Sequence, residues 1–220
     1  RFYFAKNFLT AEEAYRSYLN SFASNPLTPK VYFRLGEIHF HDKDFKRAAS
    51  YYKKAFEKRI DPEWGGFAIY KRAVCYFKLG EYSRVPAALD LIPSDLNNRK
   101  VSLRAASLRV ATGKRLQDPF EERKGYLELI DVYETISAAE TEAEELTWIV
   151  NKKTAGEEIR HWIAPDEKDQ KKGEDPVRLK KWLKRFEGKP SGGYITWKMA
   201  ILYYQKGDYS HSAQWIQHYL

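Results

Sequence analysis

Residues 29–62 read PKVYFRLGEIHFHDKDFKRAASYYKKAFEKRIDP, and the rest of the chain is organised around this stretch. Apolar residues recur at helical spacing on both sides of a short polar turn, which predicts two helices that pack on each other. The expected packing residues are Tyr32, Leu35, Gly36 and Phe40 on the first helix and Phe45, Ala48, Tyr52 and Ala55 on the second. Pro62 is expected to close the unit. A single pair cannot bury its own apolar face, so neighbouring pairs should stack on it.

The stretch resembles one tetratricopeptide repeat (TPR), a helix-turn-helix unit whose period is about 34 residues. Ala14 precedes Ala48 by 34 residues, which places the same small packing position one unit earlier. The resemblance implies an all-α, TPR-like superhelical stack of antiparallel helix pairs, with an irregular helical middle section. It implies little about activity, because such repeats usually carry no chemistry of their own.

The repeat pattern is clear towards both ends of the chain and weak between them. We expect TPR-like repeats over residues 1–93, a degenerate helical section over 94–192 and an incomplete repeat over 193–220. A stretch at 164–176 is dense in charge and free of large apolar residues, so it is expected to be a loop. The regular repeats identify the scaffold, and the irregular middle is where protein-specific function is expected.

Three positions carry the signals of a helix start. Thr10 is followed three residues later by Glu13, the spacing of a capping box. Asp118 is expected to cap a helix that has Pro119 at its first position, where the missing proline N–H would have had no partner. Pro176 should open a further helix after the charged stretch in the same way.

The second repeat is longer than the first. Tyr82 follows Phe45 by 37 residues, three more than the expected period of about 34. We expect the extra residues to lengthen a loop around Pro62, Gly65 and Gly66.

Other glycines are expected to mark turns and helix ends. Gly80 should form the turn of the second unit, and Gly113, 33 residues later, is expected to be its counterpart in a degenerate repeat. Gly156 is expected to bend or break a helix, and Gly188 should end one.

Composition excludes few function classes. The chain has 220 residues, a formal net charge of +8 and one cysteine, Cys75, so it cannot form an internal disulfide. Its mean hydropathy is −0.66, and no run approaches the roughly 18 apolar residues that a transmembrane helix needs. The Cys75 thiol lies in the apolar run AVCYF and is interpreted as a small core residue. The positive charge permits an acidic partner or an anionic surface.

The sequence carries no catalytic or metal-binding signature. His39 and His41 are two apart on a helix, so their side chains point in different directions and cannot share a metal alone. His211 and His218 share a face, but no cysteine or carboxylate pattern accompanies them. Phosphate loops, HExxH and nucleophile elbows are absent from the sequence. We therefore expect no enzyme activity, no metal and no cofactor.

The partner-binding prediction follows from the TPR resemblance. Stacked first helices form a concave groove in that family, and a peptide or helix of another protein would bind there. The residues expected to face it are Phe33, Glu37, Phe40, His41, Tyr70, Val74, Phe77, Lys78, Trp197, Ile201 and Tyr204. Phe40, Phe77 and Tyr204 are expected to be interhelix core, whereas Phe33, Tyr70 and Trp197 remain open to either role. Glu37 and Val74 argue against the lysine clamp by which some TPR proteins bind acidic C-termini.

A second candidate surface is the basic helix near residue 180. Lys180, Lys181, Lys184 and Arg185 could bind an anionic membrane surface or an acidic partner, or could form a solvated face. Nucleic acid is not an expected partner, because the cations of the chain are scattered and its aromatic residues look structural. Membrane contact is expected to be peripheral at most, or through an anchor outside the fragment.

These patterns lead to one functional hypothesis and two alternatives. The hypothesis is a non-enzymatic protein–protein interaction scaffold, part of a larger bacterial cell-envelope protein in the periplasm or at the outer membrane. The spacing of the repeats resembles the TPR regions of bacterial envelope lipoproteins such as penicillin-binding-protein activators. The alternatives are an intracellular TPR adaptor in the cytoplasm and a helical-repeat regulatory domain of a larger enzyme.

The register of the repeat, that is, which residues occupy its packing positions, predicts the effect of enlarging Ala48. Two helices should cross at this residue, so Ala48→Leu is expected to destabilise the fold by about 1 to 3 kcal/mol through overpacking. Thermal denaturation of the variant beside the parent protein measures this. An unchanged melting temperature would show that the register is wrong.

Overall fold

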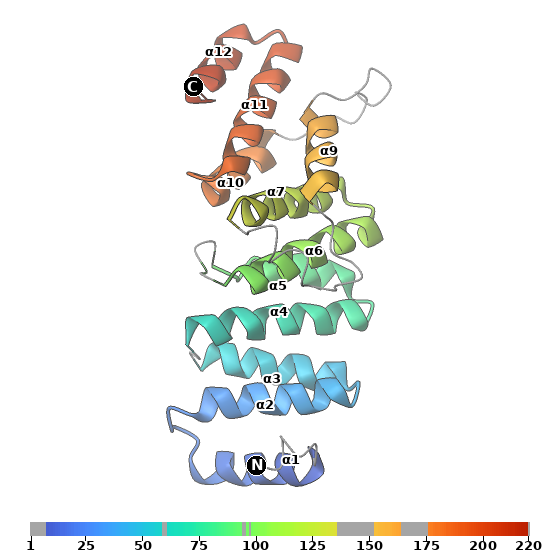
Figure 1. Cartoon of the computed structure of the whole chain (residues 1–220), viewed down its shortest axis with the longest axis vertical. Coiled ribbons are helices and arrows are strands. Elements are labelled where there is room, and N and C mark those ends of the chain that lie inside the picture. Colours follow the sequence, from blue (N-terminus) through green and yellow to red (C-terminus); the bar gives the residue numbers. More distant parts are fainter. Residues whose placement is uncertain are drawn as a thin grey trace.

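The computed structural model describes residues 8–58, 61–93, 96, 98–135, 152–163 and 176–219, and the regular structure in these residues is helical. The elements are α1 (Phe8–Ser21), α2 (Thr28–His41), α3 (Phe45–Glu57), α4 (Pro62–Lys78), η1 (Tyr82–Arg84), α5 (Val85–Leu89), α6 (Arg99–Leu116), α7 (Pro119–Thr135), α9 (Lys152–Ile163), α10 (Pro176–Phe186), α11 (Pro190–Gln205) and α12 (Tyr209–Tyr219). Figure 1 shows them stacked along one axis, with α1 at one end and α12 at the other. The expected all-α stack of adjacent helix pairs is confirmed.

The α2–α3 pair has the expected small residues at its crossing. Ala48 and Tyr52 are fully buried. A Cβ added at Gly36 would lie 2.7 Å from Cε1 of Tyr52, so a larger residue there would force the Tyr52 ring to move. Asp44 caps α3, because its Oδ1 accepts a hydrogen bond from the Arg47 backbone N–H at 3.0 Å.

One turn geometry recurs along the stack. In each copy the residue after the turn donates its N–H to the carbonyl five residues earlier, at 2.9 Å. The four bonds are Asp44 to His39, Glu81 to Tyr76, Asp118 to Gly113 and Asp208 to Tyr203. The preceding residue has positive φ in each case, at Lys43, Gly80, Gln117 and Gly207. This is the 6→1 bond of a Schellman-type helix end, which satisfies a carbonyl that the helix leaves unpaired.

The recurrence corrects the expected role of Gly113. Gly80 follows Lys43 by 37 residues and Gln117 follows Gly80 by 37, so the counterpart of Gly80 is Gln117. Gly113 lies inside α6 instead. The sequence was misleading because glycine is the usual left-handed residue, whereas Gln117 adopts φ +53° here.

Aromatic pairs close three of these turns. Each pair joins the end of one helix to the start of the next, five residues apart. The ring centroids are 5.3 Å apart for Phe40 and Phe45, 5.1 Å for Phe77 and Tyr82, and 5.3 Å for Tyr204 and Tyr209. All three are edge-on contacts, a favoured geometry for aromatic rings. The last helix pair therefore repeats the turn of the first.

The extra residues of the second unit lengthen a helix and not a loop. Asp61 caps α4 by accepting a hydrogen bond from the Trp64 N–H at 3.2 Å, so Pro62 opens this helix. Gly65 and Gly66 lie within its first turns. α4 has 17 residues and α2 has 14. A Cβ at Gly66 would meet a Leu96 methyl at 2.5 Å, which explains a glycine inside the helix.

The first two units also depart from the expected register. His39 is buried and stacks on Tyr51, at 5.1 Å between ring centroids, whereas Phe40 is only partly buried. α1 begins at Phe8, so Thr10 lies inside the helix and is not its cap. Ala14 is exposed and Ala11 is the buried alanine of α1, so the proposed small position at Ala14 is wrong.

The apolar core forms two clusters that meet at α6. One cluster joins α2 to α6 and the other joins α6 to α11. The α6 residues of the first cluster are Val101, Ala105 and Leu108, and those of the second are Leu103, Ala106 and Val110. Because α6 contributes to both clusters, it joins the regular repeats to the rest of the stack.

α6 and α7 cross very closely at two glycines. A Cβ at Gly113 would lie 2.4 Å from the Glu122 backbone nitrogen, and a Cβ at Gly125 would lie 2.8 Å from that of Val110. The close crossing at Gly113 and Gly125 packs the two helices of the middle section directly against each other.

Asp118 caps α7 as expected, accepting a hydrogen bond from the Phe120 N–H at 3.0 Å.

The C-terminal helices are fixed by polar contacts across the stack. Gly188 ends α10 with φ +70°, as expected, and α11 begins at Pro190. The buried Lys198 ammonium donates to the Trp162 carbonyl at 2.7 Å and so satisfies the end of α9.

Gly156 lies within α9, which continues through it from 152 to 163, so the expected break there is wrong. Of the expected charged loop, only Pro176, the first residue of α10, lies within the described residues.

Two helix glycines should respond in opposite directions to alanine. Gly113→Ala is expected to destabilise the protein by about 1 to 3 kcal/mol, because the new methyl meets the α7 backbone. Gly156→Ala is expected to stabilise it by roughly 0.4 to 1 kcal/mol, because a Cβ there meets nothing within 4 Å and alanine reduces the entropy of the unfolded chain.

Urea unfolding of both variants measures the difference, and each variant is the control for the other. A Gly113→Ala protein as stable as the parent would contradict the close crossing of α6 and α7.

Candidate functional site

The predicted groove residues of α2 and α4 lie largely in the core. Phe33 is 4% exposed and Tyr70 is 6% exposed. The Phe33 ring packs edge-on against Trp64, at 5.0 Å between centroids. These rings are held by neighbouring helices, so they present no open face to a ligand in this structure.

One charged groove residue, Glu37, is paired with a lysine of the neighbouring helix α4. Lys71 lies 3.2 Å from the Glu37 carboxylate and 4.7 Å from the centre of the Phe40 ring. Tyr52 also donates its hydroxyl to Glu37. Glu37 therefore holds α3 and α4 against α2, which is a structural role.

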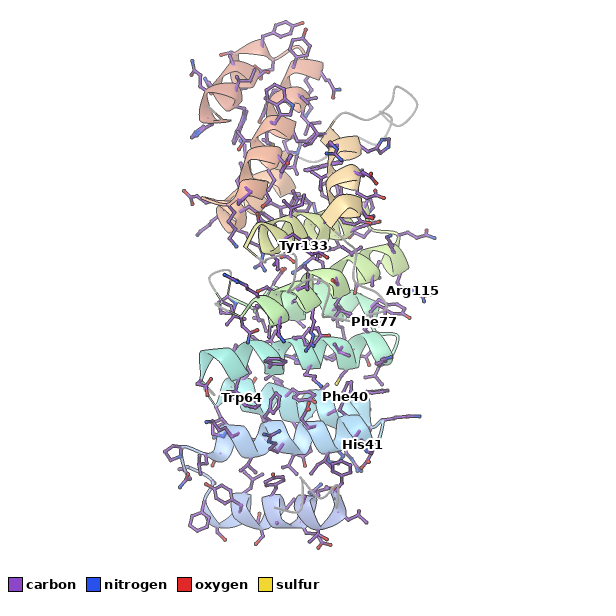
Figure 2. The ribbon with its side chains drawn as sticks, viewed as in Figure 1. Phe40, His41, Trp64, Phe77, Arg115 and Tyr133 are labelled. Atoms are coloured by element: carbon purple, nitrogen blue, oxygen red, sulfur yellow. The ribbon has the colours of Figure 1, made fainter. Side chains whose placement is uncertain are left out.

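The helix ends beside this groove are more open. His41 and Lys78 are exposed, and Phe77 is partly buried with Val74. Figure 2 shows Phe40, His41 and Phe77 near the same ends of their helices. Binding at His41 and Lys78 stays a prediction.

The groove residues of α11 form a separate surface. Trp197 is 39% exposed, Ile201 is partly buried and Tyr204 is 63% exposed, so the expected core role of Tyr204 is wrong. Its ring meets Tyr209 across the turn but leaves most of its face in solvent. α6 and α7 lie between these residues and α4 (Figure 1), so the predicted set does not converge on one site.

The basic helix α10 has one apolar and one cationic side. Leu179, Trp182 and Phe186 are buried, and Lys180, Lys181 and Lys184 are exposed. A helix has 3.6 residues per turn, so the sequence places these apolar side chains on one side of α10 and the lysines elsewhere, as the structure does. Arg185 differs from the lysines, because it is only partly exposed and its Nε donates to Glu128 Oε1 at 2.9 Å.

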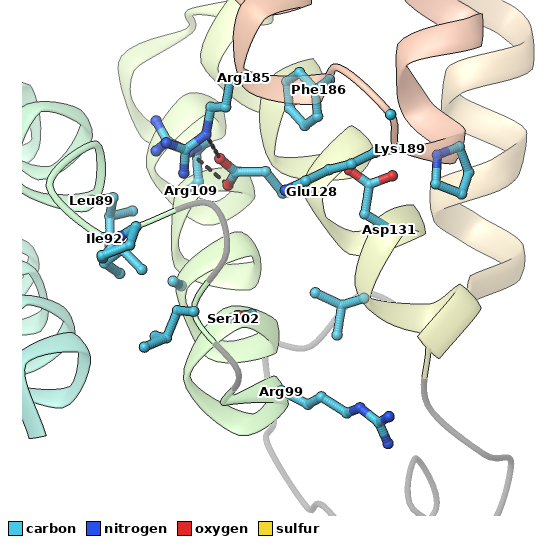
Figure 3. A pocket seen from close by; sticks show the side chains of 16 residues that line it. Leu89, Ile92, Arg99, Ser102, Arg109, Glu128, Asp131, Arg185, Phe186 and Lys189 are labelled. Atoms are coloured by element: carbon cyan, nitrogen blue, oxygen red, sulfur yellow. Dashed lines mark hydrogen bonds and ion pairs between the residues drawn. The ribbon is translucent and has the colours of Figure 1, made fainter. Parts of the chain in front are cut away.

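A cleft opens beside α10, at the junction of the two apolar clusters. Its volume is about 530 Å³. The lining comes from the end of α5, the segment that follows it, α6, α7, the end of α10 and the α10–α11 turn. The lining residues are Leu89, Ile92, Pro93, Leu96, Arg99, Ser102, Ala105, Arg109, Glu128, Asp131, Val132, Arg185, Phe186, Gly188, Lys189 and Pro190. Figure 3 shows apolar side chains on one wall and charged groups from α6, α7 and α10 around the space. We take this cleft as the candidate functional site.

A fully buried arginine forms the charged floor of the cleft. Arg109 on α6 is 0% exposed. Its guanidinium donates to Asp90 and Glu121 at 2.7 Å each, and to Glu128 at 3.0 Å. Asp90 follows α5, whereas the two glutamates come from α7, so one side chain joins three segments.

Two further cations extend this network. Lys124 donates to Asp90 at 2.7 Å, and Arg185 donates to Glu128 at 2.9 Å (Figure 3). Glu128 therefore bridges Arg109 on α6 and Arg185 on α10. Burial of these charges is tolerated because each has a partner of opposite sign within hydrogen-bond distance.

The network sets the protonation of its members. Burial alone would raise the pKa of Glu128, but Arg109 and then Arg185 outweigh it and hold the pKa below its usual 4.5. Burial also opposes ionisation of Asp90, yet Arg109 and Lys124 lower its pKa. These carboxylates stay ionised at neutral pH and hold Arg109 in its charged form.

Asp131 links the cleft to α11. Its carboxylate accepts from the Ser191 backbone N–H at 3.0 Å and from the Ser191 hydroxyl at 2.6 Å. The side chain of one helix thus caps the start of another that lies 60 residues later in the chain. Burial raises the pKa of Asp131, and the bonds from Ser191 oppose that rise.

The sequence contains a signal for this site that the net charge of the chain does not show, namely the spacing of charged residues along α7. Glu121, Lys124, Glu128 and Asp131 are spaced three, four and three apart, so they form one polar row along α7. A charged row between apolar residues of a long helix indicates a face that meets other charges. This spacing was the available signal, whereas Arg109 carried no signal of its own.

The described residues offer little else for chemistry. In them, no group of three or more His, Cys, Asp or Glu side chains could hold a metal ion. Burial raises the pKa of the Cys75 thiol to about 12, so the thiolate needed for reaction is scarce at neutral pH. No helix in this part of the chain is long and apolar enough to cross a membrane.

Comparison with known proteins identifies the repeat. Residues 29–61 match the family model for the tetratricopeptide repeat, which confirms the repeat expected there. Such repeats generally bind other proteins or peptides. No curated protein matches the chain. The crystal structure of BtubC (BKLC) from P. vanneervenii is similar at a TM-score of 0.46 and 12% identity, covering 98% of this chain and 89% of that one. A likeness at that level carries no argument about fold or function.

Removing Arg109 should destabilise the fold in a pH-dependent way. Arg109→Met leaves buried carboxylates without their cation, which is expected to cost roughly 3 to 5 kcal/mol at neutral pH. In the parent, the pKa values of Glu128 and Asp90 lie below their usual 4.5 and 3.8, so their stabilising contribution is fully present above those usual values and is lost as the pH falls from them through the lowered values. The cost of the substitution should therefore shrink when the pH is lowered from 7 to about 3.

Urea unfolding across this pH range measures the effect, and Arg115→Met is the matched control. Arg115 is an exposed arginine of the same helix, so its replacement should change stability by less than about 0.5 kcal/mol. A cost for Arg109→Met that does not change with pH would contradict the network.

Proposed function

We propose that this chain is a non-enzymatic scaffold that binds a segment of a partner protein in the cleft between α6, α7 and α10. The observation that carries this proposal is the cleft itself, a space of about 530 Å³ in a chain with a tetratricopeptide repeat. Its apolar wall and charged rim are the combination by which protein sites hold and orient a ligand.

The composition of the walls supports a side-chain pocket. Leu89, Ile92 and Val132 are buried apolar residues beside the space, with Phe186 at the end of α10. An apolar side chain of a partner would lose contact with water there, which is the main favourable term in such association. The groove between α2 and α4 is less suitable, because its rings are buried by their own neighbours.

The polar groups around the cleft support binding over catalysis. Glu128 bridges two arginines and Asp131 holds the start of α11, so neither is placed to move a proton. Ser102 lines the cleft, and its hydroxyl donates to the Asn98 carbonyl at 3.2 Å. No base beside Ser102 in the described part of the cleft activates this hydroxyl, as a nucleophilic serine requires.

We also propose that the chain belongs to a bacterial cell-envelope protein in the periplasm or at the outer membrane. The support is the spacing of the two clear repeats around a long helical interval, which resembles envelope lipoproteins. The sequence of the whole gene product tests this, since a lipoprotein signal sequence is expected upstream. Its absence, together with recovery of the tagged protein in the cytoplasm, would favour the adaptor alternative.

Filling the cleft should weaken peptide binding without harming the fold. Ser102→Phe places a ring in the space from α6, and Ser50→Phe makes the same change on the exposed face of α3. Phage clones selected on the parent protein from a random peptide library provide the probe. Their binding to Ser102→Phe is expected to fall at least about tenfold, a loss of roughly 1.4 kcal/mol, and binding to Ser50→Phe should be unchanged.

Circular dichroism and thermal melts establish that both variants are folded. Clones that bind Ser102→Phe as well as the parent would show that the cleft is not the site.

A further inference from the structure

We propose that the segment bound in the cleft is uncharged where it enters, and that an apolar residue, not an acidic or basic one, fills the space. This inference rests on the proposed function, because it names the chemistry of the partner in the same cleft. The chain as a whole carries a formal net charge of +8, which by itself would favour an acidic partner. The cleft differs from the rest of the chain, because its charges are balanced.

The ion network at the floor of the cleft holds equal numbers of positive and negative groups. Its three cations are Arg109, Lys124 and Arg185, and its three carboxylates are those of Asp90, Glu121 and Glu128. Each member is hydrogen-bonded to at least one group of opposite sign, at 2.7 to 3.0 Å. A charged ligand of either sign would therefore meet groups that already have a partner.

The other ionisable groups of the lining are engaged as well. Asp131 accepts hydrogen bonds from the Ser191 hydroxyl at 2.6 Å and from its backbone N–H at 3.0 Å. Arg99 and Lys189 also have partners. In the described part of the cleft, every ionisable side chain is thus already bonded within the protein.

A charge on the bound segment would be costly for this reason. An ionised side chain loses its hydration on entering the cleft, and it regains that free energy only by bonding to a group of opposite sign. A carboxylate would have to draw Arg185 away from Glu128, and an ammonium group would have to draw Glu128 away from Arg109. Either change would break bonds that hold α6, α7 and α10 together, so the site rejects acidic and basic residues alike.

Apolar groups supply the favourable part of the contact. Leu89 and Ile92 line the cleft at the end of α5 and just after it, and Phe186 lines it at the end of α10 (Figure 3). Val132 adds a further apolar side chain from α7. An aliphatic side chain placed among them would leave water, and that transfer needs no charged partner. The expected ligand is therefore a protein segment that inserts a leucine-like residue and keeps its charged residues outside the cleft.

The exposed cations of this region lie outside the cleft. Lys180, Lys181 and Lys184 on α10 are exposed, and none of them is among the residues that line the space. An acidic ligand attracted by the positive charge of the chain would depend on these lysines, because they are open to solvent. A segment held by apolar contact would not depend on them.

A series of peptides that differ at one position tests the charge selectivity on the full chain. The starting peptide is a fluorescent copy of a phage clone selected on the parent protein, and the varied position is the one where alanine weakens binding most. Leucine, asparagine and aspartate have similar shapes, so this series separates the loss of apolar contact from the effect of charge. Norleucine and lysine form a second pair, which differs in the terminal ammonium group.

Fluorescence anisotropy at neutral pH measures the affinities. The asparagine peptide should bind at least about tenfold more weakly than the leucine peptide, because apolar contact is lost. The aspartate peptide should bind at least about tenfold more weakly again, because an ionised group is buried without a new partner. Lysine should weaken binding by at least about tenfold relative to norleucine for the same reason.

Salt and charge reversal provide the controls. Raising sodium chloride from about 50 to about 500 mM should change the affinity of the leucine peptide by less than about twofold, because screening acts on charges. Lys180→Glu and Lys181→Glu should each change it by less than about twofold as well, since neither lysine lines the cleft. Circular dichroism establishes that both variants are folded.

The outcomes separate this inference from the proposed function. If Ser102→Phe weakens binding of the starting peptide but the aspartate or lysine peptide binds as tightly as its uncharged counterpart, the cleft binds peptides and the charge selectivity is wrong. A varied position that is acidic or basic in the selected clone, or a marked loss of affinity in both Lys180→Glu and Lys181→Glu, would overturn the selectivity too. If Ser102→Phe leaves binding of the starting peptide unchanged, the proposed function fails.

Discussion

The ion network of Arg109 holds together the part of the molecule where the repeats lose their regularity. This guanidinium has no contact with solvent and reaches carboxylates that follow α5 and that lie on α7. Through Glu128 it is joined to Arg185 on α10. A buried charge is costly unless its partners are in place, so the network favours the arrangement of these helices in which all of its members meet. The walls of the cleft are fixed by the same bonds.

The cleft exists because one helix is short. In the first unit the second helix, α3, has 13 residues, whereas α5 in the second unit has five. The chain after Leu89 runs to Asn98 without a further helix among the described residues, and Ile92, Pro93 and Leu96 line the cleft from that segment. A full second helix would cover this face of α6. The shortening of this helix therefore accounts both for the loss of repeat regularity and for the cleft.

The sequence predicted the scaffold well, whereas most of the binding residues that it predicted lie away from the cleft. Ala48, Gly36 and the cap at Asp118 were read correctly, because each depends on neighbours within one helix pair. Of the residues predicted to bind a partner, only Arg185 lines the cleft. Phe33 was ambiguous, since the same helical spacing suits a groove and a core, and only packing against Trp64 decided between them.

What the sequence determined alone is therefore local. Helical spacing, capping aspartates and prolines at first positions act over a few residues, and they define the helices and most turns. The tertiary structure decided which charges meet, because Glu128 and Arg185 are 57 residues apart and Asp131 and Ser191 are 60 apart. It also showed that Gly113 lies at a helix crossing while Gln117 takes the left-handed turn. Such choices depend on the distance between helices, which no local pattern contains.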